Sequence, residues 1–149
     1  MKVSAGILVY NGNEVFLVHP GGPFYKNKNC WFIPKGEVQD SEESDWQAAV
    51  REWEEETGDR IRNDDYIDLG FIKRSGKSNH IFAVEQDAEW KSSNTFEMRM
   101  KSGHVKNFPE ADDGKWFTLE EADKVLPKNQ KVFIKRIREY LSLKQNGPT

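Results

Sequence analysis

Three carboxylates in one short segment are the side chains of this sequence best placed to do chemistry. Glu52, Glu55 and Glu56 stand at positions i, i+3 and i+4, which puts them on one face of a helix. Like charges at this spacing repel each other, and the repulsion grows where the local dielectric is low. Carboxylate oxygens are ligands that Mg²⁺ and Mn²⁺ prefer, so the segment predicts a divalent-cation site. The alternative is an acidic helix face that is only solvated.

The helix that carries these acids is predicted over residues 44–57. Its apolar stripe recurs at i, i+3, i+4 and i+7 and consists of Trp46, Ala49, Val50 and Trp53. Asp40 or Ser41 can cap the start of the helix, and Gly58 can cap its end. Because the acidic face flanks the apolar stripe, we expect the carboxylates at the edge of the core.

The residues around the acidic run carry a longer pattern. Gly36 precedes the helix, Glu43 stands eight residues before Arg51, and Gly58 follows the acids. These positions resemble the signature of the Nudix hydrolases, in which Gly, five residues, Glu and seven residues lead to Arg-Glu-apolar-any-Glu-Glu-any-Gly-apolar. Two positions depart from it: six residues separate Gly36 from Glu43, and Asp59 replaces the final apolar residue. The extra residue falls in a polar loop, where insertions are tolerated, and we expect Asp59 to change only the packing at the helix exit.

Two further segments resemble one branch of that family, the diadenosine-polyphosphate hydrolases. The run Trp-Phe-Ile-Pro-Lys-Gly at 31–36 is similar to the lead-in strand of the branch. The run Phe-Pro-Glu at 108–110, followed by Trp116 and Phe117, is similar to its late catalytic loop. The resemblance as a whole covers most of residues 3–126.

The resemblance implies a substrate in which a nucleoside diphosphate is linked to another group. Water attacks one phosphorus and a phosphate leaves, a step that needs charge neutralisation more than covalent help. The implied metal ligands are the Gly36 carbonyl and the carboxylates of Glu52, Glu55 and Glu56. Glu52 is also a candidate base for the attacking water. Glu110 is the other candidate, as base or extra ligand, and Glu97 is a weaker rival.

Two basic residues are also expected to have roles, Arg51 by the same resemblance and Lys35 by its place between a strand and the metal loop. Arg51 is expected to pair with Glu43 and to hold the loop against the helix. Lys35 could meet a phosphate as a point charge. The ordinary alternatives are a surface ion pair for Arg51, a solvated side chain for Lys35, and an unremarkable loop acid for Glu110.

Composition narrows the class of protein. The 149 residues predict a single domain, 1–149, with a frayed tail at 145–149. The net charge of −3 argues against general binding of polyanions such as long nucleic acid. Cys30 is the lone cysteine and no apolar run is long enough to span a bilayer, so we expect a soluble, cytoplasmic protein. The spacing of His19, His80 and His104 does not suggest zinc.

The remaining periodicity predicts strands and two further helices. A short helix is predicted to start at Thr118, where the sequence has a capping-box pattern. A final amphipathic helix is predicted from the apolar stripe of Ile134, Ile137 and Leu141. The strands are expected at 3–9, 15–18, 67–73, 80–85 and 95–100 and around residues 116–117. The run Gly-Lys-Ser at 76–78 precedes a strand pattern and therefore predicts a hairpin turn, not a phosphate-binding loop. The order of elements, with the family resemblance, predicts an α+β fold with a mixed central sheet in an α/β/α sandwich.

We therefore predict a Mg²⁺-dependent Nudix pyrophosphohydrolase acting on a small nucleotide, with dinucleoside polyphosphates favoured as substrates and Mn²⁺ as a possible substitute metal. Hydrolysis of ADP-ribose, oxidised nucleotides or RNA 5′ ends remains open, as does a nucleotide-sensing regulator on the same fold. Phe24, Tyr25 and Phe82 could stack on a base, although aromatic residues in sheets are more often part of the core. The oligomeric state does not follow from the sequence.

Overall fold

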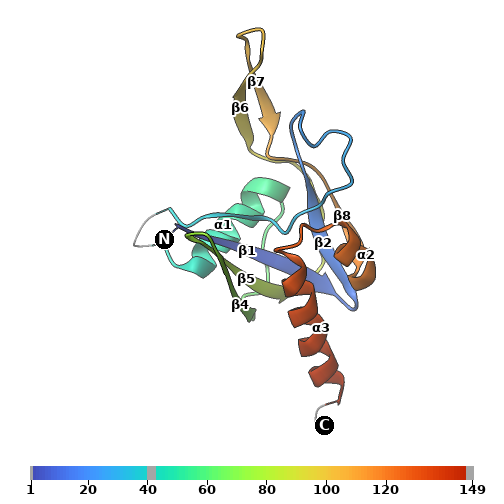
Figure 1. The fold of residues 1–149 in the computed structure, drawn as a ribbon. Coiled ribbons are helices and arrows are strands. Elements are labelled where there is room, and N and C mark those ends of the chain that lie inside the picture. Colours follow the sequence, from blue (N-terminus) through green and yellow to red (C-terminus); the bar gives the residue numbers. More distant parts are fainter. Residues whose placement is uncertain (1, 40–42, 147–149) are drawn as a thin grey trace.

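A mixed six-stranded sheet lies between helices in the computed structural model, which describes residues 2–39 and 43–146 (Figure 1). The elements are β1 (Lys2–Asn11), β2 (Glu14–Pro20), β3 (Lys35–Glu37), α1 (Asp45–Thr57), β4 (Ile67–Arg74), β5 (Lys77–Glu85), β6 (Thr95–Arg99), β7 (Val105–Pro109), β8 (Ala111–Thr118), α2 (Leu119–Val125) and α3 (Lys131–Asn146). The main sheet has the order β4-β5-β1-β2-β8, and β3 pairs with β1. The β1–β5 pair is parallel, whereas the other pairs are antiparallel, so the predicted mixed sheet is confirmed.

The two faces of the sheet are covered by different helices because strand side chains alternate. Leu8 and Tyr10 of β1 belong to one core, which α2 and α3 close with Leu119, Ala122, Phe133, Ile134 and Ile137. Ile7 and Val9 of the same strand belong to the other core, which α1 closes with Ala48, Ala49 and Trp53. The result is the predicted α/β/α sandwich, with α1 on one face and the C-terminal helices on the other.

Helix α1 begins and ends with well-formed caps. Ser44 is the N-cap: its side chain accepts a hydrogen bond from the Gln47 amide, and the Gln47 side chain accepts one from the Ser44 amide. The cap is therefore not Asp40 or Ser41, which lie outside the described residues. Gly58 closes the helix in the left-handed region at φ 72°, as predicted, and its N–H donates to the Glu54 carbonyl.

The apolar run 31–33 is not a strand, contrary to the expected lead-in strand. Only an isolated bridge, Val18 to Phe32, joins it to β2. The flanking amides donate elsewhere: Trp31 N–H to the Val125 carbonyl at 2.9 Å and Ile33 N–H to the Gln130 side chain at 2.8 Å. These bonds to the C-terminal helical segment replace a sheet ladder, and the strand forms after Pro34 instead, as β3.

Strands β6 and β7 form a separate two-stranded sheet that projects from the body of the molecule (Figure 1). We call residues 95–109 the arm. Sequence periodicity predicted β6 but not β7, because the run Val-Lys-Asn-Phe-Pro does not alternate apolar and polar residues cleanly. The predicted pair 116–117 lies within the longer strand β8.

The C-terminal helix is longer than predicted. α3 continues to Asn146, so Gln145 and Asn146 are helical and not part of a frayed tail, and residues 147–149 lie outside the described residues. The hairpin at 76–78 is confirmed, since β5 starts at Lys77. A search of the described helices found none with the length and apolarity needed to cross a membrane.

Candidate functional site

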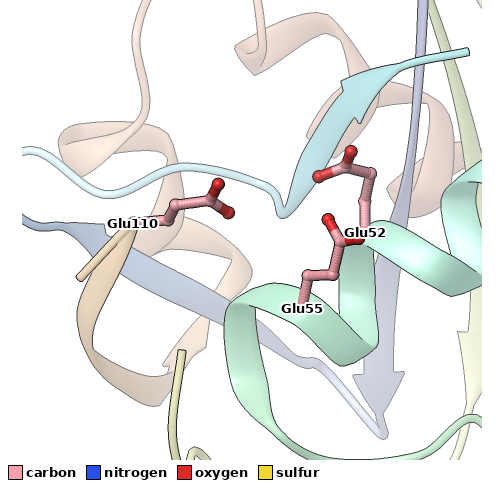
Figure 2. A group of neighbouring side chains, drawn as sticks. All are labelled: Glu52, Glu55 and Glu110. Atoms are coloured by element: carbon pink, nitrogen blue, oxygen red, sulfur yellow. The ribbon is translucent and has the colours of Figure 1, made fainter. Parts of the chain in front are cut away.

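Carboxylates from two distant segments meet beside α1. Glu52 and Glu55 of α1 and Glu110 of the β7–β8 junction each offer an oxygen, and these oxygens lie within 4.8 Å of one another. Figure 2 shows the two helix glutamates and the Glu110 side chain converging on one space. Three acids this close need an opposite charge between them, which makes the group a candidate metal centre. We call Glu52, Glu55 and Glu110 the acidic cluster.

Gly36 lies against this cluster on the short strand β3. A Cβ atom at this position would overlap the carboxylate of Glu52. The Glu52 carboxylate can keep this position only with a glycine at residue 36, because any other residue would displace it. The pairing of Gly36 with Ala5 of β1 fixes this approach.

Arg51 connects the loop before α1 to the cluster. Its Nε and Nη2 donate to the Glu43 carboxylate at 2.8 and 3.1 Å, and Nη2 also donates to the Glu37 carbonyl at 3.0 Å. Nη1 donates to Glu52 at 2.8 Å and, more weakly, to both oxygens of Glu55 at 3.4 Å. The hydrogen bonds from Arg51 lower the pKa of Glu43, and those with Glu43 raise the pKa of the guanidinium. The eight-residue spacing seen in the sequence thus forms a bidentate ion pair.

Glu56 lies next to the acidic cluster and beside Lys35. Its Oε2 atom is shielded from solvent and has no hydrogen-bond partner among the described residues, although the Lys35 backbone bonds to the carboxylate. Burial, then the charges of Glu52 and Glu110, raise the pKa of Glu56 well above its ordinary value. Burial lowers the pKa of Lys35, against the attraction of Glu56 and Glu52. A buried carboxylate oxygen without a partner is an observation that fits a cation ligand.

The pKa values of Glu52 and Glu110 are raised as well. Burial is the largest cause that raises the pKa of Glu52, and Arg51 opposes it. Burial and then the charges of Glu52 and Glu55 raise the pKa of Glu110. Glu97, the weaker candidate, is exposed on β6 and does not belong to the acidic cluster.

Segment 90–94 carries Glu110 to the cluster, and sequence reasoning missed it. The Asn94 amide donates to the Glu55 carbonyl at 2.7 Å, and the Asn94 carbonyl accepts from the Glu110 amide at 2.7 Å. The Ser93 hydroxyl accepts from the Ala111 amide at 3.0 Å. Asn94 therefore bridges the backbones of two cluster residues that are 55 positions apart in the sequence. No local pattern reveals backbone bonds of this kind.

The same segment caps the C-terminal end of α1. The Trp90 indole donates to the Glu56 carbonyl at 3.0 Å, and the amides of Lys91 and Ser92 donate to the Thr57 carbonyl. These carbonyls have no partner within the helix, so the segment satisfies them. The end of α1 that carries the acids is thereby held.

Asp59, expected only to alter packing, is a buried hub of this region. It is 2 % exposed, and its carboxylate accepts from the Arg60 amide at 2.9 Å, the Arg62 guanidinium at 3.0 Å and the Glu89 amide at 3.2 Å. It joins the exit of α1 to the segment before Trp90. At this position, where the signature has an apolar residue, Asp59 is buried and stabilised by hydrogen bonds instead.

The NUDIX domain family model matches residues 1–138, and the chain belongs to this family. Two curated relatives from Arabidopsis thaliana agree: Nudix hydrolase 7 is 45 % identical over 58 residues, and Nudix hydrolase 5 is 29 % identical over 132 residues. These matches cover 38 % and 80 % of this chain but only 20 % and 37 % of the relatives. The predicted family is confirmed.

Solved structures share the fold at low sequence identity. A C. elegans Ap4A hydrolase binary complex has a TM-score of 0.60 and 22 % identity, covering 95 % of this chain and 98 % of that one. The NUDIX domain of Shewanella oneidensis NrtR complexed with ADP ribose has a TM-score of 0.63 and 18 % identity, covering 94 % and 86 %. The E. coli ORF135 protein has a TM-score of 0.61 and 20 % identity, covering 100 % and 94 %. These similarities confirm the predicted fold class.

Proposed function

We propose that this protein is a Mg²⁺-dependent pyrophosphohydrolase that cleaves a phosphoanhydride bond in a nucleoside diphosphate linked to another group. The observation that carries the proposal is the convergence of Glu52, Glu55 and Glu110 on one space beside Gly36. Three acids held this close repel one another, and Arg51, which donates to Glu52 and Glu55, offsets only part of that repulsion, so a bound cation would stabilise the group.

The residues that would hold the metal fit a hard divalent cation. They are Glu52, Glu55 and Glu56 with the Gly36 carbonyl, and Glu110 is an additional donor. An all-oxygen set suits Mg²⁺, and Mn²⁺ would be accepted. When bound, the cation offsets the negative charge of the phosphates and makes water easier to deprotonate.

The remaining residues of the site support hydrolysis directly. Glu110 and Glu52 are the candidate bases for the attacking water, and the raised pKa of each carboxyl brings it closer to working pH. Lys35 faces Glu56 and is a candidate for neutralising a phosphate charge. Arg51, paired with Glu43, orients Glu52 and the loop through hydrogen bonds from all three guanidinium nitrogens.

Dinucleoside polyphosphates are the substrates we favour. The support is the resemblance of 31–36 and 108–117 to the diadenosine-polyphosphate hydrolases and the fold shared with the C. elegans Ap4A hydrolase. The ADP ribose bound by the NrtR domain makes ADP-ribose the first competitor to test.

The deciding experiment is hydrolysis of a nucleotide panel with Mg²⁺ in ¹⁸O water, with products resolved by mass. The panel contains diadenosine polyphosphates, ADP-ribose, oxidised nucleoside triphosphates and triphosphorylated RNA. We expect turnover of the diadenosine compounds, with the label in one defined product. Nucleotide-induced stabilisation without turnover would instead indicate a sensor.

Glutamine variants on α1 test the metal role with a control on the same helix. Glu55→Gln and Glu56→Gln should each lower kcat at least 100-fold, because the developing charge loses its partner. Glu54→Gln changes the same charge at an exposed position of the same helix and should stay within twofold of wild type. Hydrolysis that survives both Glu55→Gln and Glu56→Gln would refute the assignment.

A further inference from the structure

The two ends of the arm are held together by backbone hydrogen bonds where it joins the body of the molecule. The last pair of the β6–β7 ladder joins Thr95 to Pro109, and the next residues, Asn94 and Glu110, are hydrogen-bonded to each other at 2.7 Å. The chain therefore leaves and returns at the same point, beside the acidic cluster. Glu110 is held by bonds outside the arm, so the arm is not needed to position it.

The arm contacts the loop that follows β2. The Gly21 amide donates to the Glu110 carbonyl at 3.0 Å, and a Cβ added to Gly22 would lie 3.0 Å from the Phe96 ring. Figure 1 shows this loop and the arm side by side at the same end of the molecule. We call residues 21–29 the entry loop. Both segments therefore adjoin Glu110: the arm ends at the preceding residue, Pro109, and the entry loop is bonded to the Glu110 backbone.

These two segments are basic within an acidic protein. Together they contain Lys26, Lys28, Arg99, Lys101 and Lys106 against the single acid Glu97, a net charge of +4 with His104 neutral, whereas the whole chain carries −3. All the arm's charged side chains are exposed. A positive surface beside a phosphate-cleaving site attracts the anionic parts of a ligand.

The two faces of the arm differ in character. Cross-strand partners share a face, so Phe96 and Phe108, with Met98 and Lys106, form the face that approaches Gly22. The opposite face carries Arg99 and Glu97. One face is therefore aromatic and apolar with one ammonium group, a composition that suits a nucleotide: a ring to stack and a phosphate to pair.

The entry loop contributes a matching group. Phe24 is 65 % exposed, more than any other aromatic side chain among the described residues. The Lys28 ammonium lies 3.4 Å from the centroid of the Phe24 ring. Exposing an aromatic ring to water is unfavourable, and a ring held in place by a neighbouring side chain offers a surface on which a base can stack.

We propose that the arm face and the entry loop bind the distal nucleotide of a dinucleoside polyphosphate, the half that lies beyond the scissile bond. Lys106 pairs with its phosphates and Phe24 stacks on its base. The Met98–Lys106 pair stands three residues beyond the base of the arm, roughly 10 Å along the strand, so a ligand must extend past the acidic cluster to reach it. This assignment rests on the proposed function and makes the arm a determinant of substrate choice.

The test is calorimetric binding in Mg²⁺ of two ligands that cannot be hydrolysed. They are diadenosine tetraphosphate with methylene groups in place of the bridging oxygens and the equivalent methylene analogue of ATP, which lacks the distal adenosine and its phosphate. Lys106→Gln and Phe24→Ala probe the proposed surface. Arg99→Gln is the matched control, since it removes the same charge from the opposite face of the same arm.

Wild-type protein should bind the dinucleotide analogue at least fivefold more tightly than the ATP analogue. Lys106→Gln should weaken the dinucleotide about five- to tenfold and Phe24→Ala about fivefold or more, each leaving the ATP analogue within twofold. Arg99→Gln should leave both ligands within twofold. Added salt should reduce the wild-type preference more than that of Lys106→Gln.

Three results would overturn the assignment: no dinucleotide preference in wild type, equal losses in Lys106→Gln and Arg99→Gln, or equal losses for both ligands. The hydrolysis panel separates this outcome from failure of the proposed function. A protein that shows the binding preference but never turns over diadenosine tetraphosphate would keep the distal site and lose the enzymatic proposal.

Discussion

At the scale of single residues, Gly36 places a steric constraint on the acidic cluster itself. The alanine variant would force its methyl group into the Glu52 carboxylate, so either β3 or Glu52 must move. We expect Gly36→Ala to lower kcat/KM about 100-fold, because displacements near 1 Å at a reacting centre have effects of that size. The measurement is turnover together with the Mg²⁺-induced shift in Tm. If a folded Gly36→Ala variant kept wild-type turnover and the wild-type Mg²⁺-induced shift in Tm, the close approach of β3 to Glu52 would not matter for function.

Glu56 should make the stability of the metal-free protein depend on pH. Its carboxyl faces Glu52, Glu110 and Lys35, and its pKa in the folded state lies well above the ordinary value of 4.5. The folded state therefore binds this proton more tightly than the unfolded chain does. The stabilisation is complete below the unfolded pKa and is lost as pH rises through the folded pKa.

The pH effect is isolated by comparing wild type with Glu56→Gln in a chelator. As pH rises above the ordinary glutamate pKa of 4.5, the Tm of wild type should fall relative to that of the variant. Mg²⁺ competes with the proton, so its stabilisation of wild type should grow over the same range and be reduced in the variant. Parallel pH profiles for the two proteins would contradict the shifted pKa.

At the scale of elements, the exit of α1 depends on a buried charge. Asp59→Ala would leave the Glu89 and Arg60 amides without their acceptor and loosen the segment that caps the helix. We expect a loss of about 2–3 kcal/mol in the free energy of unfolding, measured by urea denaturation. Asp64→Ala, at an exposed position nearby, should change it by less than about 0.5 kcal/mol. Equal effects of the two substitutions would mean that the hub does not stabilise the helix end.

At the scale of the whole molecule, the arm should be separable from the folded body. Replacing residues 96–108 with a two-residue Asn-Gly turn keeps Thr95, Pro109 and the bond between Asn94 and Glu110. We expect the unfolding free energy to change by less than about 1 kcal/mol, since a solvated two-stranded hairpin is only marginally stable. Calorimetric unfolding measures this, and Mg²⁺-induced stabilisation reports whether the acidic cluster persists. Loss of folding would show that the arm supports the main sheet.

Local features of the fold were predictable from the sequence because they depend on interactions between residues that are close together in the chain. The stripe of α1, the αL glycine at Gly58 and the hairpin at 76–78 all depend on residues a few positions apart. The same periodicity put Glu52 and Glu55 on one face. The family signature added the ion pair of Arg51 with Glu43, which is also a short-range feature.

Features that depend on distant partners were missed or wrong. The run 31–33 has strand-forming residues, yet its amides bond to Val125 and Gln130, nearly a hundred positions away. Strand β7 forms because β6 lies opposite it, not because its own pattern alternates.

The sequence by itself determined the acidic face of α1, which the local spacing of the glutamates encodes. Its resemblance to the Nudix signature indicated the family and, with the order of elements, the α/β/α class. Only the tertiary structure decided that Glu110 joins this face, because Asn94 bridges the Glu55 carbonyl and the Glu110 amide. The tertiary structure also decided that Asp59 is buried and that the arm lies against the entry loop. Contacts between segments remote in the sequence depend on how loops close in space, and no local pattern specifies that closure.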